Sequence, residues 1–373
     1  MKNTLFDYLK WRGNLTFQQD AMNEVDCAIC CLLSYLPWDK VVPPMESNTA
    51  ITLKDAIKKY QSIDQPKTYS NASRVEKDER LLQQLLTSSR YQDVLLSNFS
   101  NHLDVVEEKQ FSAITFSLNE KAHVIAYRGT DDSIVGWKED FNMSFKETVP
   151  AQQEALLYLE TRMEQFDGSF YIVGHSKGGN LAVYASTFTN SNNQNRIEQI
   201  YNFDGPGFNQ ELLKKIKQQA KITTFVPQSS IVGMLLEHEE DYQIVHSYQL
   251  GLLQHDLYSW EVILNHFTIL ETVTKSSQFL NQTIKEWLQK LSKEEREMFV
   301  DTLYEILLAT DVKTTEDLTT NWMKKAKIIL NQIHTIDPDS KLLITEILLS
   351  LFRIGKKNLP LYLRMRNRNN QDS

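Results

Sequence analysis

Residues 171 to 180 decide the fold of this chain, and they read Tyr171-Ile172-Val173-Gly174-His175-Ser176-Lys177-Gly178-Gly179-Asn180. The first three residues favour a strand, and the apolar residues 181–188 that follow predict a helix. Between them stands Ser176, with Gly174 and Gly178 in the G-x-S-x-G spacing of a nucleophile elbow. An ordinary glycine-rich turn is the alternative. The elbow interpretation predicts a nucleophilic serine beside the positively polarised amino end of a helix.

The bulk composition is that of a globular protein with a sizeable core. The chain has 373 residues, of which 41% are hydrophobic and 24% are charged. This length predicts one α/β domain that carries extensions. The net charge of −8 argues against nucleic-acid binding as the main activity, because phosphate contacts need a basic face.

Neither end of the chain predicts export or membrane insertion. Residues 1–12 lack the long apolar core of a secretory signal, and the apolar runs at 28–36 and 342–352 are shorter than a membrane span. We therefore expect a cytoplasmic protein. The basic tail is interpreted either as a contact with an anionic membrane surface or as a solvated segment, and it contains Lys356, Lys357, Arg364, Arg366 and Arg368.

The cysteines predict neither disulfides nor a metal site. Cys27, Cys30 and Cys31 lie within one expected helix, and their odd number offers no distant partner. No histidine stands close to them in sequence, so we interpret them as small core residues. We expect no metal and no cofactor.

The order of expected elements predicts an α/β fold with a mostly parallel central sheet. Residues up to about 100 are expected to be mainly helical, and the strands 111–118 and 122–127 to form a hairpin. Helices and strands then alternate to residue 248, which implies right-handed crossovers and function at the carboxyl ends of the strands. The chain divides into a domain at 1–270 with a helical amino-terminal part and a helical carboxy-terminal region at 271–373.

A serine nucleophile needs a histidine to remove its proton and an acid to orient that histidine. Asp204 is the best candidate acid because it ends the expected strand 197–203 before Gly205-Pro206-Gly207, although it is also suited to an Asx turn. His255 follows the last expected strand, where the base of such a triad stands. His246 lies within the expected strand 242–248 and is the alternative base, and Asp256 is the alternative acid.

An oxyanion hole needs two N–H donors, one from the residue after the serine and one from an earlier loop. Lys177 supplies the first. Thr130, in the Tyr127-Arg128-Gly129-Thr130 segment after a strand, offers both its amide and its hydroxyl. We expect Asp140 to hold that loop and His175 to support the elbow. A polar turn without a catalytic role is the alternative for the loop.

With these motifs the chain resembles the class 3, fungal-type lipase superfamily of α/β-hydrolases, which pairs an Arg-Gly-Thr/Ser loop with a Gly-His-Ser-x-Gly-Gly elbow. It is most similar to an uncharacterised branch of low-GC Gram-positive bacteria, over about residues 1–270. That likeness rests on the elbow, on residues 202–208, on Val226-Pro227 with residues 230–233, and on Gln254-His255-Asp256. The resemblance implies Ser176 as nucleophile, His255 as base, and Thr130 and Lys177 as oxyanion donors.

The chain departs from the superfamily pattern at two places. Leu commonly follows the serine in fungal-type lipases, whereas Lys177 stands here. The segment that carries the acid in those lipases reads Pro227-Gln228-Ser229-Ser230, without a carboxylate, so Asp204 has to substitute. Lys177 either pairs with a buried acid or favours a substrate that carries a phosphate or carboxylate.

Together these features predict a serine hydrolase of acyl esters, with a small-molecule lipid or lipid-like ester as its substrate. The alternatives are a non-catalytic interaction protein on a hydrolase scaffold and an acyltransferase, which differs only in the nucleophile that accepts the acyl group.

Overall fold

The structure is a computed structural model. It describes residues 2–63, 72–130, 134–143, 146, 148–208, 210–216, 221–230, 232–234, 242–308, 349 and 353. The basic tail lies outside these residues, and so do Asp337 and Pro338, whose sequence predicts the start of a helix.

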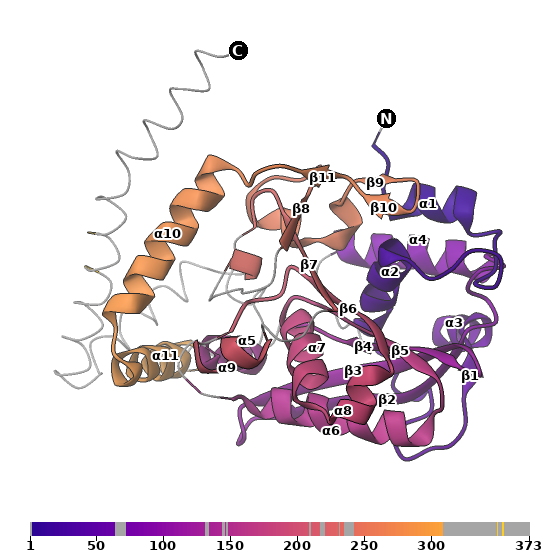
Figure 1. Ribbon diagram of the computed structural model, residues 1–373, viewed down its shortest axis with the longest axis horizontal. Helices are drawn as coiled ribbons and strands as arrows, with labels where there is room; N and C mark the ends of the chain where they lie inside the picture. The colour runs from indigo at the N-terminus through magenta and orange to yellow at the C-terminus, as the bar shows by residue number, and fades with distance from the viewer. Residues whose placement is uncertain are drawn as a thin grey trace, which may run out of the picture.

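The described strands build a nine-stranded sheet that is parallel in its middle and antiparallel at both edges (Figure 1). The strands from β4 to β8 run parallel to one another. The pairs β1–β2, β2–β3, β3–β4 and β8–β11 are antiparallel. In spatial order they are β1 (Ile51–Thr52), β2 (Leu95–Asp104), β3 (Lys109–Asn119), β4 (Ala122–Tyr127), β5 (Ser169–His175), β6 (Ile197–Phe203), β7 (Ile222–Pro227), β8 (Tyr242–Val245) and β11 (Ile269–Leu270). A separate ribbon pairs β9 (Val262–Ile263) with β10 (His266–Phe267).

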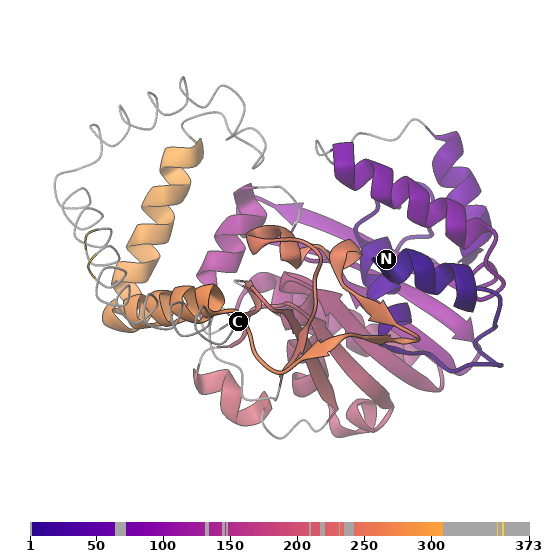
Figure 2. The same ribbon diagram turned by 90° about the horizontal axis from the view of Figure 1, so that it is seen from above.

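Helices cover both faces of this sheet, as Figure 2 shows from above. The amino-terminal helices lie on one face, and they are α1 (Leu5–Arg12), α2 (Glu24–Ser34), α3 (Leu53–Ser62) and α4 (Ala72–Leu86). Among them, α2 packs on β4 and β5. The helices on the other face are α6 (Pro150–Gln165), α7 (Lys177–Phe188), α8 (Ser191–Asn195) and α9 (Gln210–Ile216). Here α6 packs on β3, and α7 packs on β5. A buried apolar layer fills each interface. This three-layer arrangement confirms the predicted α/β-hydrolase fold.

Three further helices complete the described chain. α5 (Ile134–Asn142) follows β4, and α10 (Lys275–Lys290) and α11 (Lys293–Leu308) form the carboxy-terminal pair. The pair Ser292 and Glu295 predicts a capping box before α11. The structure contains it, because Ser292 N donates to Glu295 Oε2 at 2.7 Å and Glu295 N donates to Ser292 Oγ at 3.1 Å. Trp287 and Phe299 meet edge to face with ring centroids 5.6 Å apart, so the two helices pack on each other.

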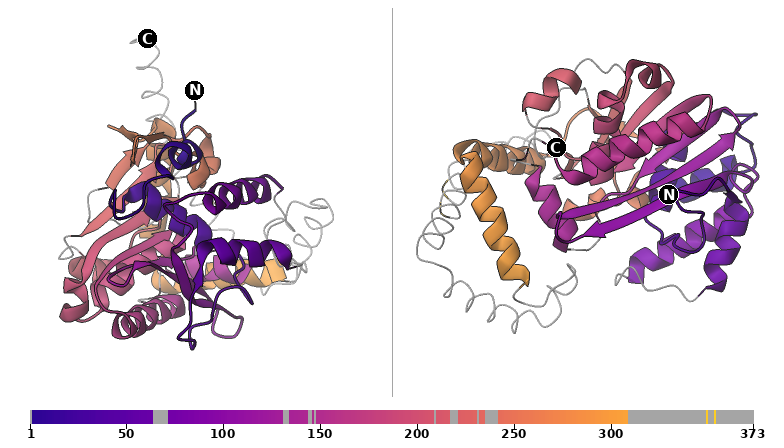
Figure 3. Two further views of the ribbon diagram at one scale, coloured as in Figure 1. Left: turned by 90° about the vertical axis from the view of Figure 1, so that its right-hand side faces the viewer. Right: turned by 90° about the horizontal axis from the view of Figure 1, so that it is seen from below.

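The region up to about residue 100 is mainly helical, as predicted, but the sequence does not predict β2. This strand begins at Leu95, and it pairs with β3 as a long antiparallel ribbon (Figure 3). Its register shifts between Ser97 and Ser100, where Asn98 has a φ of 54°. The bulge leaves buried Ser and Asn side chains in the strand, a composition more typical of loops. The expected strand 242–248 is likewise shorter, because β8 ends at Val245.

The cysteines occupy the core, as predicted. Cys27, Cys30 and Cys31 are buried free thiols in α2. Burial raises the pKa of each thiol above its usual range, so all three are protonated.

Candidate active site

Ser176 stands at a strained corner between β5 and α7. Its backbone has φ 57° and ψ −134°, a conformation that a non-glycine residue adopts rarely. The flanking glycines are needed for space. A Cβ at Gly174 would lie 1.9 Å from the carbonyl oxygen of Gly178, and a Cβ at Gly178 would lie 2.1 Å from that of Tyr127. The corner therefore has the geometry of a nucleophile elbow.

Asp204 and His255 meet at the same carboxyl edge of the sheet. Asp204 directly follows β6, and its Oδ2 lies 2.6 Å from His255 Nδ1. A Cβ at the next residue, Gly205, would lie 2.6 Å from the carbonyl oxygen of Ser176, so the acid loop packs directly on the elbow. The structure thus brings the predicted acid, base and serine into one region.

The carboxylate of Asp204 is held on both of its oxygens. Oδ1 accepts hydrogen bonds from Ser230 Oγ at 2.5 Å and Gly233 N at 3.1 Å, while Oδ2 faces the imidazole. Only 1% of the Asp204 side chain is exposed. A carboxylate in this position accepts the Nδ1–H of His255, which leaves Nε2 of the neutral ring as the atom able to take a proton.

His175 joins the elbow to His255. Its Nδ1 lies 2.8 Å from the hydroxyl of Tyr35, and its Nε2 lies 2.8 Å from the backbone carbonyl of His255. Since the carbonyl can only accept, Nε2 carries the proton and Nδ1 accepts from Tyr35. Burial and the neighbouring His255 ring hold the pKa of His175 well below its usual range. His175 is therefore neutral, and it orients its neighbours.

The loop that carries Thr130 lies against the serine. A Cβ at Gly129 would lie 2.8 Å from Ser176 Cβ, so only glycine fits there. Thr130 Oγ1 donates to Asp140 Oδ2 at 2.6 Å, which is the contact expected for Asp140. Lys177 is the first residue of α7, and amides in a first helical turn have no intrahelical acceptor. Both expected oxyanion donors thus belong to segments in contact with the elbow.

The side chain of Lys177 points into the protein, where it forms a buried ion pair. Its Nζ lies 2.8 Å from Glu139 Oε2 and 2.9 Å from the carbonyl oxygen of Gln110. Lys177 is 1% exposed and Glu139 is fully buried. Of the two interpretations offered by the sequence, the structure shows the buried pair.

We expect Lys177→Met to destabilise the protein by about 3–5 kcal/mol, because it leaves the Glu139 carboxylate buried without its cation. Chemical denaturation measures the free energy of unfolding. The double variant Lys177→Met/Glu139→Gln is the control, and it should recover most of the loss. A single variant as stable as the wild type would show that the pair contributes little.

The remaining candidates have other partners. Asp256 lies 2.7 Å from Lys77 and caps η3 (Leu257–Ser259), and His246 Nδ1 lies 3.0 Å from Glu261. His246 follows β8 instead of lying within it, and its amide donates to the carbonyl oxygen of Thr268 at 2.9 Å. Asp204 and His255 remain the best-placed acid and base.

Several residues that shape the site gave no signal in the sequence. Tyr35 lies 140 positions before the histidine that it contacts. Ser230 and Gly233 belong to a segment that carries the family resemblance, but the sequence does not indicate that they bond Asp204. Glu139 stands next to Asp140, but nothing in the sequence indicates a lysine as its partner. These contacts depend on the folded arrangement of separate loops.

Within the described ranges, no group of three or more His, Cys, Asp or Glu side chains is arranged to hold a metal ion. In the same part of the chain, no helix has the length and apolar character needed to cross a membrane.

The chain was compared with known proteins. No curated protein matches it. Solved structures that match include a point variant of MDLA from Penicillium cyclopium, with 16% identity, a TM-score of 0.35, and coverage of 48% of this chain and 70% of that chain. A structure described only as a fungal lipase has 14% identity, a TM-score of 0.38, and coverage of 67% and 86%. The Rhizomucor miehei lipase–propeptide complex has 16% identity, a TM-score of 0.34, and coverage of 41% and 57%.

These solved structures include fungal lipases, with TM-scores below 0.5. The fold of this chain is identified by its own strand order and by the elbow at Ser176. The assignment to a bacterial branch stays a prediction. A family model described as Mbeg1-like matches residues 85–305, which contain the sheet strands from β2 to β11, the elbow, Asp204 and His255. Since that match covers more than half of the chain, the protein belongs to the Mbeg1-like family.

Proposed function

We propose that this protein is a serine hydrolase that cleaves carboxylic esters through Ser176, His255 and Asp204. The observation that carries the proposal is the 2.6 Å contact between His255 Nδ1 and Asp204 Oδ2, beside a serine in the strained elbow conformation. A buried acid that orients a histidine beside such a serine is the arrangement that activates a hydroxyl.

The proposed reaction has two halves. His255 Nε2 removes the proton of Ser176 Oγ as the oxygen attacks the ester carbonyl, and the imidazolium then protonates the leaving alcohol. Water, deprotonated by His255, next attacks the acyl-enzyme; the acid is released as the imidazolium returns the proton to Ser176 Oγ. Amides of Thr130 and Lys177 would stabilise the oxyanion in both halves. Asp204 fixes the tautomer of the neutral His255 ring and stabilises the imidazolium that forms from it.

The substrate class is proposed to be an acyl ester of lipid or lipid-like character. The motif resemblance supports this class, and the buried Glu139 partner of Lys177 removes the reason to expect an anionic group next to the serine.

A series of p-nitrophenyl esters, from acetate to palmitate, tests both the reaction and the preferred acyl length. We expect the purified protein to release p-nitrophenol with saturation kinetics from at least one ester. Adding an alcohol as a competing acceptor separates hydrolysis from acyl transfer, because transfer would form a new ester. A folded protein that hydrolyses none of the series would count against the proposal.

A further inference from the structure

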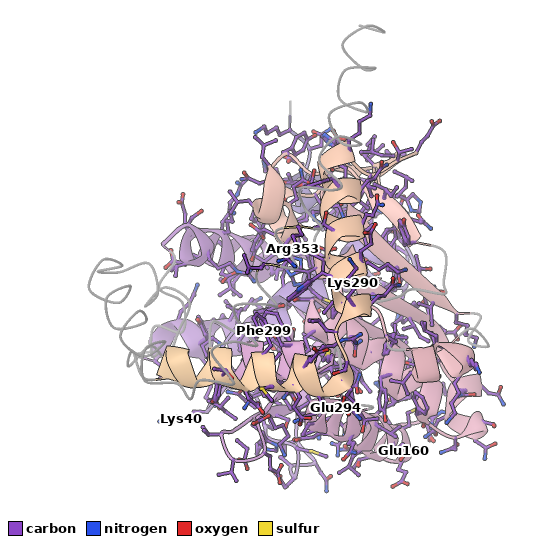
Figure 4. All side chains as sticks on the ribbon, turned by 90° about the vertical axis from the view of Figure 1, so that its left-hand side faces the viewer. Lys40, Glu160, Lys290, Glu294, Phe299 and Arg353 are labelled. Carbon is purple, nitrogen blue, oxygen red and sulfur yellow. The ribbon has the colours of Figure 1, made fainter. Side chains whose placement is uncertain are left out.

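The carboxy-terminal helices contact the acid side and the oxyanion side of the candidate active site. α10 runs from the β11 edge of the sheet, and α11 turns back beside α5 (Figures 1 and 4). Figure 4 places Lys290 and Glu294 where the two helices meet and Phe299 in the angle between them. The two helices thus pack on each other where they meet, and each also contacts the rest of the protein.

The first end meets the segment that holds Asp204. Thr274, the residue that caps α10, donates its amide to the carbonyl oxygen of Gln228 at 2.6 Å. Ser277 Oγ donates to the carbonyl oxygen of Ser230 at 2.6 Å, and Ser230 Oγ in turn donates to Asp204 Oδ1 at 2.5 Å. Ser277 is 2% exposed. The first turn of α10 therefore fixes the backbone of the residue that bonds the acid.

The second end meets α5. Lys138 Nζ lies 2.9 Å from Asp301 Oδ1 of α11 and 4.4 Å from the ring centroid of Tyr304. The same ammonium lies 2.5 Å from Glu108 Oε1. Burial alone would lower the pKa of Lys138, but its bonds to Glu108 and Asp301 raise it above the usual value. The lysine therefore remains charged and ties α11 to α5.

Three consecutive residues of α5 reach three different parts of the protein. Lys138 bonds α11, Glu139 bonds Lys177 at the start of α7, and Asp140 bonds Thr130 of the oxyanion loop. A helix is stiff over one turn, so a displacement at Lys138 moves Asp140 with it. The position of Thr130 thus depends on how α11 holds α5.

We infer that α10 and α11 position the catalytic groups, with Ser277 acting on Asp204 through Ser230 and Asp301 acting on Thr130 through α5. This inference rests on the proposed function. Neither residue contacts the reacting atoms, so both are positioning residues. Loss of the Asp301 contact should weaken stabilisation of the oxyanion by Thr130. Loss of the Ser277 contact should weaken the hydrogen bond between Asp204 and His255.

The α11 arm of the test compares Asp301→Ala with Glu297→Ala, which removes an exposed acid one turn earlier on the same helix. We expect Asp301→Ala to lower kcat about tenfold, less than the loss of a whole oxyanion donor, while KM stays within about twofold. Asp301→Glu should recover most of the rate, and Glu297→Ala should match the wild type. Amide hydrogen exchange over residues 127–143 should rise in Asp301→Ala only.

The α10 arm uses Ser277→Ala. A looser Asp204 carboxylate stabilises the imidazolium form of His255 less well, so the acidic limb of the kcat/KM profile should move to lower pH. Asp301→Ala should leave that limb in place, a difference that a general loss of stability would not produce.

Equal kcat, pH profile and exchange in Asp301→Ala, Ser277→Ala and Glu297→Ala would overturn the inference while the wild-type activity stands. A wild type that hydrolyses no ester would instead remove the proposed function. In that case hydrogen exchange still decides whether α11 controls the position of α5, with unchanged exchange in Asp301→Ala counting against it.

Discussion

We expect Ser176→Ala to lower ester turnover by about 10⁵- to 10⁶-fold, because the variant lacks the oxygen that forms the acyl-enzyme. The backbone cost is small in comparison. Serine already adopts a φ of 57° at this position, and alanine has to adopt the same angle. The variant should therefore keep the fold, with a modest loss of stability. Initial rates with the best ester of the p-nitrophenyl series measure the effect.

The matched control for this variant is Ser62→Ala, which removes an exposed hydroxyl from the last residue of α3. It should retain most of the wild-type rate, because Ser62 Oγ donates to the carbonyl oxygen of Lys59 within the same helix. If Ser176→Ala kept more than a hundredth of the wild-type turnover, another nucleophile would have to carry the reaction.

The second large effect is expected for Asp204→Asn, which should lower kcat by about 10⁴-fold. An amide at this position can present its NH₂ group to His255 Nδ1, which favours the wrong tautomer and removes the charge that stabilises the imidazolium. Ser230 Oγ and Gly233 N both donate to Oδ1, so the amide oxygen will take that side and leave the NH₂ group facing the ring.

Asp256→Asn provides the control for Asp204→Asn, since Asp256 is next to His255 in sequence but bonds Lys77. Circular dichroism and thermal unfolding of both variants separate lost chemistry from lost folding. Near-normal turnover in Asp204→Asn, together with a large loss in Asp256→Asn, would transfer the role of acid to Asp256.

Much of the site follows from local sequence. The elbow can be recognised because its requirements are steric and short-range: two glycines that leave room for neighbouring backbone, and a helix that starts at the serine. Asp204 is identifiable because parallel strands end at a common edge, so a carboxylate just after β6 comes near the elbow. The same argument placed His255 ahead of His246.

Other features could not be predicted because they depend on contacts between distant segments. β2 carries buried polar residues at a bulge, and its strand character comes from pairing with β3. The sequence leaves two interpretations of the Lys177 side chain, and only the folded structure places Glu139 of α5 beside it. The contact of Tyr35 with His175 likewise joins the end of α2 to the elbow, two segments that are far apart in the sequence.

The most direct test of the account is covalent labelling of the wild-type protein with a fluorophosphonate, followed by peptide mass spectrometry. We predict one adduct per chain, located on Ser176, with a labelling rate that falls strongly in His255→Ala. A folded protein that gains no adduct, or gains it on a different residue, would contradict the claim that Ser176 is an activated nucleophile.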